Sequence, residues 1–172
     1  AFTNNETNWL GILYDKALKL QHFDVEEYCH NPVCHRISFM YALLYEHDQL
    51  TRLTHDNLHE LFGICSTTVF KHLALMARQQ HIVGASDTDV YMPHWNRLNI
   101  PITFIHGAEN ACYLPETTER SFNTLVEKNG AEGYARHVIP NYGHIDCIFG
   151  KNAAEDVYPH ILSALDQNNT RR

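Results

Sequence analysis

Apolar residues recur at helical spacing through most of the first hundred positions of the chain. One such stripe lies near the N-terminus, and a second follows Pro32, which is expected to interrupt the chain between them. Thr54 is positioned to cap a short helix, and either Ser66 or Thr67 can cap a longer helix that ends near residue 80. The pattern therefore predicts a mostly helical first region.

The pattern changes at Pro101, where β-branched and aromatic residues replace the helical stripes. The predicted elements are a strand over residues 102–107, a helix over residues 115–130, a strand over residues 134–140 and a final helix from Asn152 that Pro159 kinks. This order predicts two parallel strands joined by a crossover helix. Both faces of such a pair need to be covered, so we expect the chain to be a piece of a larger α/β domain.

Composition narrows the class of protein. The chain has 172 residues, 44% of them hydrophobic and 19% charged, which is typical of a soluble globular protein. No apolar run is long enough to span a membrane. A net charge of −7 argues against binding to nucleic acid. Five scattered cysteines indicate reduced thiols and hence a cytoplasmic location.

Candidate chemistry lies where each predicted strand ends. Glu109 and Asn110 follow the first strand, and His144 follows the second. Because the carboxyl ends of parallel strands meet at one edge of a sheet, these side chains are expected to come together there. An acid beside a histidine fixes the tautomer of the imidazole, which can then act as general base for a serine or cysteine nucleophile.

These residues carry a resemblance to a known family. The stretches "LNIPITFIHGAEN" and "HVIPNYGHIDCIFGKNAAEDVYPHIL" resemble the acid and histidine loops of α/β-hydrolases of the acid-lipase branch. They are more similar still to hydrolase modules fused behind, or encoded with, cholesterol-oxidase-like flavoproteins of bacteria. The resemblance implies a helical cap over residues 1–98 and a C-terminal portion of the hydrolase core over residues 99–172. The family nucleophile and oxyanion hole would then lie upstream of this chain.

Two departures from the family pattern are evident. No Gly-x-Ser-x-Gly occurs, and the nearest stretch, "FGICSTT", lacks the second glycine. The family acid sits three residues after the strand glycine, which places Asn110 there after Gly107, while Glu109 is one position early. We take Glu109 as the working acid with Asn110 beside it; the alternative is that Asn110 occupies the acid position.

The resemblance implies a carboxylic-ester hydrolase of the esterase or lipase kind, with His144 as base and Glu109 or Asn110 orienting it. Its substrate would be a hydrophobic ester, such as a sterol or lipid ester. A flavoprotein oxidoreductase module in the same chain or operon and a second copy of the chain are candidate partners. No cofactor is expected, and the 172 residues alone are expected to be inactive because their nucleophile is absent.

Two alternatives come from other classes of protein. One is a non-catalytic, hydrolase-like interaction fragment. The other is a winged helix-turn-helix over residues 54–92, in which a hairpin would follow the second helix. Its candidate recognition helix offers only Lys71 and Arg78 as cations, which would neutralise phosphates poorly.

A short segment near Pro32 offers four possible zinc ligands. They are Cys29, His30, Cys34 and His35. Adjacent residues point apart, and four ligands from one tight loop rarely form a tetrahedron, so a turn of the cap is the better prediction. His55 and His59 are spaced one helical turn apart without an evident third ligand. No metal site is therefore predicted.

The remaining polar residues near the two loops have structural interpretations. Asp146 is expected to accept hydrogen bonds from loop amides rather than to act in the site. His106 lies in an apolar strand and is expected to belong to the core or to support the site from behind. Cys112 and Cys147 are expected to be buried as small hydrophobic residues.

Overall fold

The structure is a computed structural model that describes residues 13, 16, 29, 31–62 and 66–169. Its elements are α2 (Pro32–Tyr41), η1 (His47–Gln49), α3 (Arg52–Asp56), α4 (Leu58–Leu61), α5 (Thr67–Gln79), η2 (Met92–Leu98), β1 (Ile102–Gly107), α6 (Pro115–Asn129), β2 (Tyr134–Ile139), α7 (Asp146–Phe149), α8 (Ala153–Asp156) and α9 (Tyr158–Asn169). Apart from residues 13 and 16, the predicted helix near the N-terminus lies outside the described residues. What is described has a helical first part and an α/β second part.

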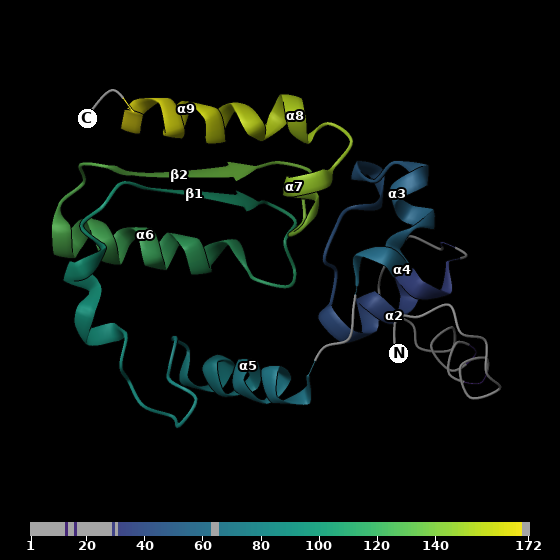
Figure 1. Ribbon diagram of the computed structural model, residues 1–172, viewed down its shortest axis with the longest axis horizontal. Coiled ribbons are helices and arrows are strands. Elements are labelled where there is room, and N and C mark those ends of the chain that lie inside the picture. The colour runs from purple at the N-terminus through teal and green to yellow at the C-terminus, as the bar shows by residue number, and fades with distance from the viewer. Residues whose placement is uncertain (1–12, 14–15, 17–28, 30, 63–65, 170–172) are drawn as a thin grey trace.

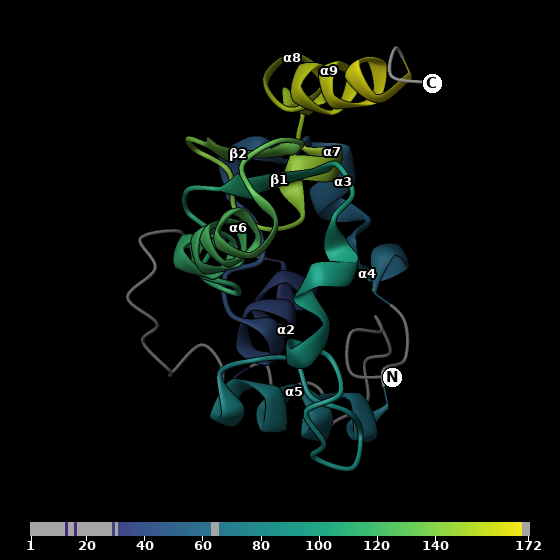
Figure 2. The ribbon, with the colours of Figure 1, turned by 90° about the vertical axis from the view of Figure 1, so that its left-hand side faces the viewer.

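Strands β1 and β2 pair in parallel, with Ile102 opposite Tyr134 and Gly107 opposite Ile139. Helix α6 connects them and covers one face of the pair, while α8 and α9 lie over the other face (Figures 1 and 2). Both strands and their parallel order are confirmed, which places this part of the chain in the α/β class. The order puts the ends of both strands at the same edge, facing the helices of the first part (Figure 1).

The crossover helix α6 follows directly from its sequence. Pro115 occupies its first turn, where a missing N–H costs nothing, and Leu125 is buried against the strands. Gly130 ends the helix with φ of +86°, and its N–H donates to the carbonyl of Val126. Arg136 on β2 donates to the Pro115 carbonyl at 2.8 Å, which fixes the start of the helix to the neighbouring strand.

The first part differs from the prediction at the start of α3. Pro32 begins α2, the helical segment predicted to follow it, and Asn31 before it accepts hydrogen bonds from two N–H groups of the first turn. Thr51 caps α3, and Thr54 lies inside that helix and donates its N–H to the Thr51 hydroxyl. Of the two caps proposed for α5, Ser66 is the one observed.

The closing segment forms two separate helices, α8 and α9, rather than one kinked helix. Asn152 stands before α8 as predicted but makes no side-chain cap bond, and Val157 separates α8 from α9. Pro159, the second residue of α9, cannot donate to a preceding turn, which explains why the break lies just before it. Helix α9 leaves a hollow over β1 that is lined by Pro101, Thr103, Ile105, Ile161, Ala164 and Leu165.

The larger buried cluster joins the two parts of the chain. Its residues in the helical part are Val33, Cys34, Ile37, Leu44, Tyr45, Leu50 and Leu58. Cys112, Ile145 and Phe149 from the strand-end loops pack against this cluster. The predicted boundary at residue 98 therefore does not separate two independent cores; whether a cap begins and ends there stays a prediction.

Residues 44–51, here called the docking segment, make the backbone contacts across this junction. The Leu44 carbonyl accepts hydrogen bonds from the N–H groups of both His144 and Ile145, at 2.8 and 2.9 Å. The Gln49 carbonyl accepts from the Lys151 N–H, and the Gln49 amide donates to the carbonyl of Asn141. The loop that carries His144 is thereby held by a segment from the helical part.

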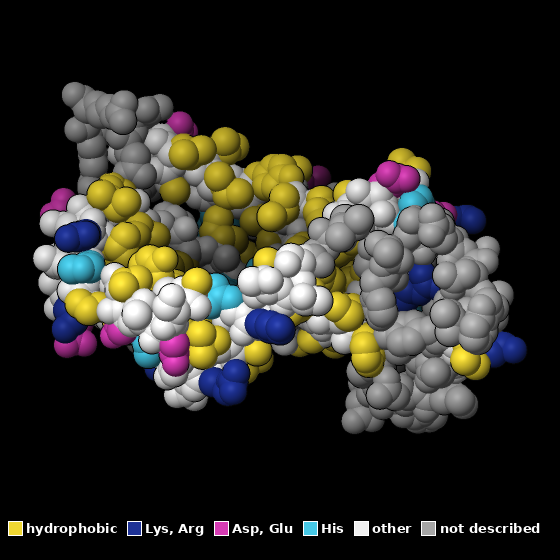
Figure 3. All heavy atoms as spheres, turned by 60° about the horizontal axis from the view of Figure 1, so that its bottom comes forward, with side chains coloured by type: hydrophobic (Ala, Val, Ile, Leu, Met, Phe, Trp, Pro, Cys, Tyr) yellow, Lys and Arg dark blue, Asp and Glu magenta, His cyan; other side chains and the backbone are white. Residues whose placement is uncertain are grey.

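On the side shown in Figure 3, Lys and Arg side chains are scattered rather than gathered into a patch. The hairpin expected after α5 is absent from the described residues, where a turn with a Gly84 N–H to Thr88 carbonyl bond follows the helix instead. No described helix combines the length and apolarity that a membrane crossing needs.

Candidate functional site

The candidate site lies at the strand ends, where two loops come into close contact. A Cβ atom built on Gly107 would stand 1.9 Å from the carbonyl oxygen of Gly143, so only glycine allows this approach. The Glu109 N–H donates to the Tyr142 carbonyl at 2.9 Å, and the Ala108 N–H donates to the carbonyl of Ile139. The loop after β1, which carries Glu109 and Asn110, and the loop after β2, which carries His144, are thus joined by backbone hydrogen bonds alone.

Asn110 and His144 meet across this junction. The Asn110 Nδ2 atom lies 3.1 Å from Nδ1 of His144, and Asn110 is 3% exposed. The Asn110 Oδ1 atom accepts hydrogen bonds from the N–H groups of Cys112 and Tyr113, at 3.1 and 2.9 Å. Because those two donors hold Oδ1, the amide has one orientation, with its NH2 group facing the imidazole.

This orientation determines which nitrogen of the imidazole carries the proton. The Asn110 NH2 group can only donate, so Nδ1 of His144 must accept, and the neutral ring then carries its proton on Nε2. A carboxylate in the same place would accept from Nδ1–H and leave Nε2 free to take a proton. Asn110 therefore preserves the placement of a triad acid but reverses the polarity of its hydrogen bond.

The surroundings of His144 favour its neutral form. Burial lowers the pKa of the imidazole, the nearby His106 lowers it further, and the charge of Asp146 opposes the shift in part. The ring of Tyr113 lies 5.0 Å from the His144 ring, centroid to centroid, at an angle of 51°. The histidine is consequently placed as a neutral hydrogen-bonding group at ordinary pH.

Glu109 and Asn110 have different positions relative to the imidazole. Glu109 is exposed, while the contact to the imidazole comes from Asn110, which was the alternative to our preferred acid. The reason is the length of the turn: the Asn110 N–H donates back to the Gly107 carbonyl at 3.2 Å, which directs the third residue after the glycine inward. The catalytic role of either residue stays a prediction.

The supporting residues take the places expected of them. Asp146 is fully buried, and its Oδ2 atom accepts from the N–H groups of Gly143 at 2.9 Å and Glu46 at 3.2 Å. Its Oδ1 atom has no hydrogen-bond partner among the described residues, and burial raises the pKa of its carboxyl group. His106 is buried and pairs through Nε2 with the Tyr113 carbonyl at 2.8 Å.

The two cysteines beside the loops are free thiols in largely apolar surroundings. Cys147 is buried, whereas Cys112 is only half-buried. Burial raises the pKa of both thiols, that of Cys147 to about 11. Thiols with raised pKa are poor nucleophiles near neutral pH, which agrees with a packing role for both.

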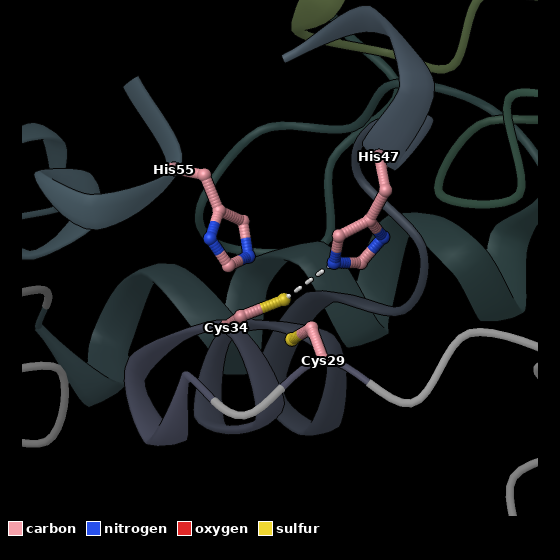
Figure 4. Close-up of side chains that lie close together, drawn as sticks. All are labelled: Cys29, Cys34, His47 and His55. Carbon is pink, nitrogen blue, oxygen red and sulfur yellow. Dashed lines mark hydrogen bonds between the residues drawn. The ribbon is translucent and has the colours of Figure 1, made fainter. Parts of the chain in front are cut away.

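The four possible zinc ligands near Pro32 do not face one common point. His35 turns away, and its Nε2 atom pairs with the Cys29 carbonyl at 2.6 Å, while His30 lies outside the described residues. Cys29 and Cys34 instead face His47 and His55 from later segments of the chain (Figure 4). Hydrogen bonding to Cys34, and to His47 as well, holds the pKa of the Cys29 thiol well below its usual range.

No spacing motif in the sequence pairs His47 with Cys34, because a turn separates the two residues. His59, the other histidine weighed with His55, lies 3.1 Å from the carboxylate of its neighbour Glu60. Only His55 of that pair reaches the cysteines. The one hint available from sequence was the number of histidines shortly after the two cysteines.

A scan against protein-family models and searches of curated proteins and solved structures found no match to this chain. The resemblance to α/β-hydrolases therefore remains an expectation from the sequence. Function has to be argued from the strand-end geometry and from the chemistry of the residues that it brings together.

Proposed function

We propose that this region is the histidine-bearing part of an α/β-hydrolase that cleaves hydrophobic carboxylic esters, with His144 as its imidazole. The observation that carries the proposal is the contact between Asn110 and His144 at the carboxyl ends of two parallel strands. Open α/β sheets collect their chemistry at this edge, and a polar side chain that orients a histidine is the arrangement an acyl-transfer site needs.

In the proposed reaction, His144 reacts through its minor tautomer, in which Nδ1 carries the proton and Nε2 is free to accept the proton of a serine hydroxyl supplied by another part of the protein. The serine oxygen then attacks the ester carbonyl, the alcohol leaves with the proton from the imidazolium, and an acyl-enzyme remains. His144 next takes a proton from water, whose oxygen attacks the acyl-enzyme; the acid is released as the imidazolium returns its proton to the serine oxygen. Asn110 takes part only by positioning the ring.

The amide at position 110 sets an expected limit on the rate. In serine hydrolases, replacing the triad acid by its amide lowers kcat by roughly 10⁴-fold because the imidazole adopts the wrong tautomer. The amide also cannot stabilise the imidazolium that forms during turnover. We therefore expect slow ester hydrolysis by the natural protein, and a much faster reaction when Asn110 is replaced by Asp.

The same observation favours a second candidate, a hydrolase-like region without catalytic activity. With its proton on Nε2, His144 donates a hydrogen bond toward the place where a serine would stand. Such a group can bind the carbonyl or carboxylate of a ligand without turnover. The two candidates differ in whether an acid restored at position 110 produces an esterase.

The test uses the natural full-length protein that contains these residues, assayed with p-nitrophenyl esters of increasing chain length. The wild type, His144→Ala and Asn110→Asp are compared. The ester-hydrolase proposal expects activity that His144→Ala removes and Asn110→Asp raises by up to roughly 10⁴-fold in kcat. No hydrolysis by either the wild type or Asn110→Asp would overturn it in favour of the non-catalytic candidate.

Two further variants make the assay specific. Asn123→Asp introduces the same change on the exposed face of α6 and should leave kcat as it was. Glu109→Gln tests the acid preferred from sequence: a loss of rate as large as that of His144→Ala would assign the orienting role to Glu109 rather than to Asn110.

A further inference from the structure

Four side chains from the helical part of the chain converge on one point. The donor atoms of Cys29, Cys34, His47 and His55 all lie within 4.8 Å of one another. Cys29 lies three residues before α2, Cys34 lies in α2, His47 in η1 and His55 in α3, and all four side chains point toward one another (Figure 4). Convergence from four short segments distinguishes this group from a cluster formed by chance along one helix.

The separations fit a tetrahedral ion. With zinc–sulfur bonds near 2.3 Å and zinc–nitrogen bonds near 2.0 Å, neighbouring donors in a tetrahedron stand roughly 3.3 to 3.8 Å apart. The donors here lie within 4.8 Å, and the Cys34 Sγ to His47 Nε2 distance is 3.0 Å. Binding an ion would therefore require donors at the upper end of this range to approach one another by about 1 Å.

One of the four candidate ligands, His55, has a buried ring nitrogen whose hydrogen bonding is incomplete. The Nε2 atom of His55 is buried and makes no hydrogen bond of standard geometry among the described residues, although the Cys29 thiol lies near enough to interact with the ring. A buried polar atom without a partner is costly, and native structures rarely leave one unless a water or an ion satisfies it. The opposite ring nitrogen lies 3.9 Å from the carboxylate of Asp56, which is beyond hydrogen-bond distance.

The surroundings hold the group in place, and burial argues against Cys34 as a catalytic thiol. Asn31 caps α2 beside Cys34, and its amide donates to the His55 carbonyl at 2.7 Å, so one side chain links two of the ligand segments. The hydroxyl of Tyr45 donates to the Cys34 sulfur at 3.0 Å. Cys34 is 2% exposed, so a substrate cannot reach it, although its contact with His47 has the form of a nucleophile and its base.

We propose that Cys29, Cys34, His47 and His55 bind a structural Zn²⁺ ion. Two sulfur and two imidazole donors form the set that zinc prefers in tetrahedral structural sites, and four protein ligands leave no open position for a reaction. This site is independent of ester hydrolysis, and its presence does not require the strand-end proposal to be correct.

The position of the site defines what the ion does for the fold. His47 lies within the docking segment, whose Leu44 carbonyl accepts the N–H groups of His144 and Ile145. An ion bound to His47, to α2 and to α3 therefore fixes the segment on which the histidine loop rests. Zinc at this place stabilises the junction between the helical part and the strand ends.

The test measures metal directly on the natural full-length protein, purified reduced and without chelators. Elemental analysis should give about one zinc per chain. Co²⁺ exchanged into the site should show the intense visible bands of a tetrahedral ion and the near-ultraviolet band of thiolate bound to cobalt. Removal of the metal should lower the midpoint of thermal unfolding, and added Zn²⁺ should restore it.

Variants separate binding from a failure to fold. Cys34→Ser and His47→Gln should lose the bound zinc and the cobalt spectrum, and His47→Gln keeps the buried cysteine intact. The matched controls, Cys112→Ser and His59→Gln, change the same residue types nearby and should retain about one zinc per chain. Circular dichroism of each variant shows whether its helices have formed.

Three results would overturn the proposal. The first is reduced wild-type protein that contains no zinc and binds none on titration. The second is zinc that persists in both Cys34→Ser and His47→Gln. The third is a disulfide between Cys29 and Cys34 in metal-free protein isolated under native conditions.

Discussion

The two sites of this protein are built in opposite ways. At the strand ends, regular backbone brings Asn110 to His144: two parallel strands in register end side by side, and the loops need to add only a few residues. In the helical part, Cys29, Cys34, His47 and His55 come from short segments with turns between them, and side-chain contacts determine the arrangement. The first site is a property of the topology, and the second is a property of particular side chains.

The comparison implies that changes to the backbone disturb the strand-end site most. The cluster of Cys29, Cys34, His47 and His55 is disturbed most by replacement of its sulfur and nitrogen donors. Gly107→Ala should have the largest effect, because the added Cβ would meet backbone oxygen atoms at 1.9 and 2.2 Å. We expect the free energy of unfolding to fall by about 3 kcal/mol or more, measured by chemical denaturation. The zinc content of the folded fraction should stay unchanged.

Gly130→Ala provides the matched control for this variant. No atom lies within 4 Å of the added Cβ, and the cost comes only from the backbone conformation, φ +86° and ψ 167°, at about 1 to 3 kcal/mol. A Gly107→Ala protein as stable as the Gly130→Ala protein would mean that the two strand-end loops are not in the close contact described.

Asp146→Ala breaks the link between the two regions and should have an intermediate effect. It removes the acceptor for the N–H groups of Gly143 and Glu46, and both donors would lose their hydrogen bond. We expect a loss of about 2 to 3 kcal/mol in the free energy of unfolding. Amide hydrogen exchange should speed up at both donors.

Asp48→Ala is the control for Asp146→Ala, since it removes an exposed carboxylate from the same docking segment. Its effect should stay within about 0.5 kcal/mol. Equal stability of the two variants would contradict the role given to Asp146 at the junction.

The smallest expected effect is the pH dependence due to His144. Its pKa in the folded protein lies below the ordinary value of 6.5, so the unfolded chain binds the proton more readily. The contribution of His144 to stability is therefore complete above pH 6.5 and is lost as the pH falls from there through the lowered pKa. NMR titration of the His144 ring should give a midpoint below 6.5, set chiefly by burial and by His106.

His144→Gln should remove this part of the pH dependence of unfolding while leaving the contributions of other histidines. A midpoint above 6.5 in the wild type would show that Asp146, the one opposing charge named for this ring, outweighs burial and His106.

The strand-end site could be predicted from the sequence more fully than the cluster, because regular backbone positions its residues. The first strand was predicted at residues 102–107 and is observed there, and the parallel order followed from the crossover helix alone. The strand-end site was foreseeable because its residues directly follow those strands. Which of Glu109 and Asn110 would face the imidazole depended on the hydrogen bonding of a single turn, which residue types do not reveal.

The cluster was not foreseeable to the same degree. After α2 the chain reverses at Ala42, whose φ of +65° is unusual for a residue with a side chain and is not announced by a glycine. That reversal brings His47 back to Cys34, so the ligand set depends on a conformation that no local pattern indicates. Pro32, by contrast, begins the helical segment that the sequence predicts after it, because Asn31 caps its first turn.

The docking of Asp146 onto Glu46 joins positions that are 100 residues apart in the chain. Contacts so distant in sequence form slowly, because the long intervening chain must first lose much of its freedom. During synthesis the earlier half emerges well before the loop that it will hold. We therefore expect the imidazole at position 144 to become ordered late in folding, so that immature molecules lack a formed site.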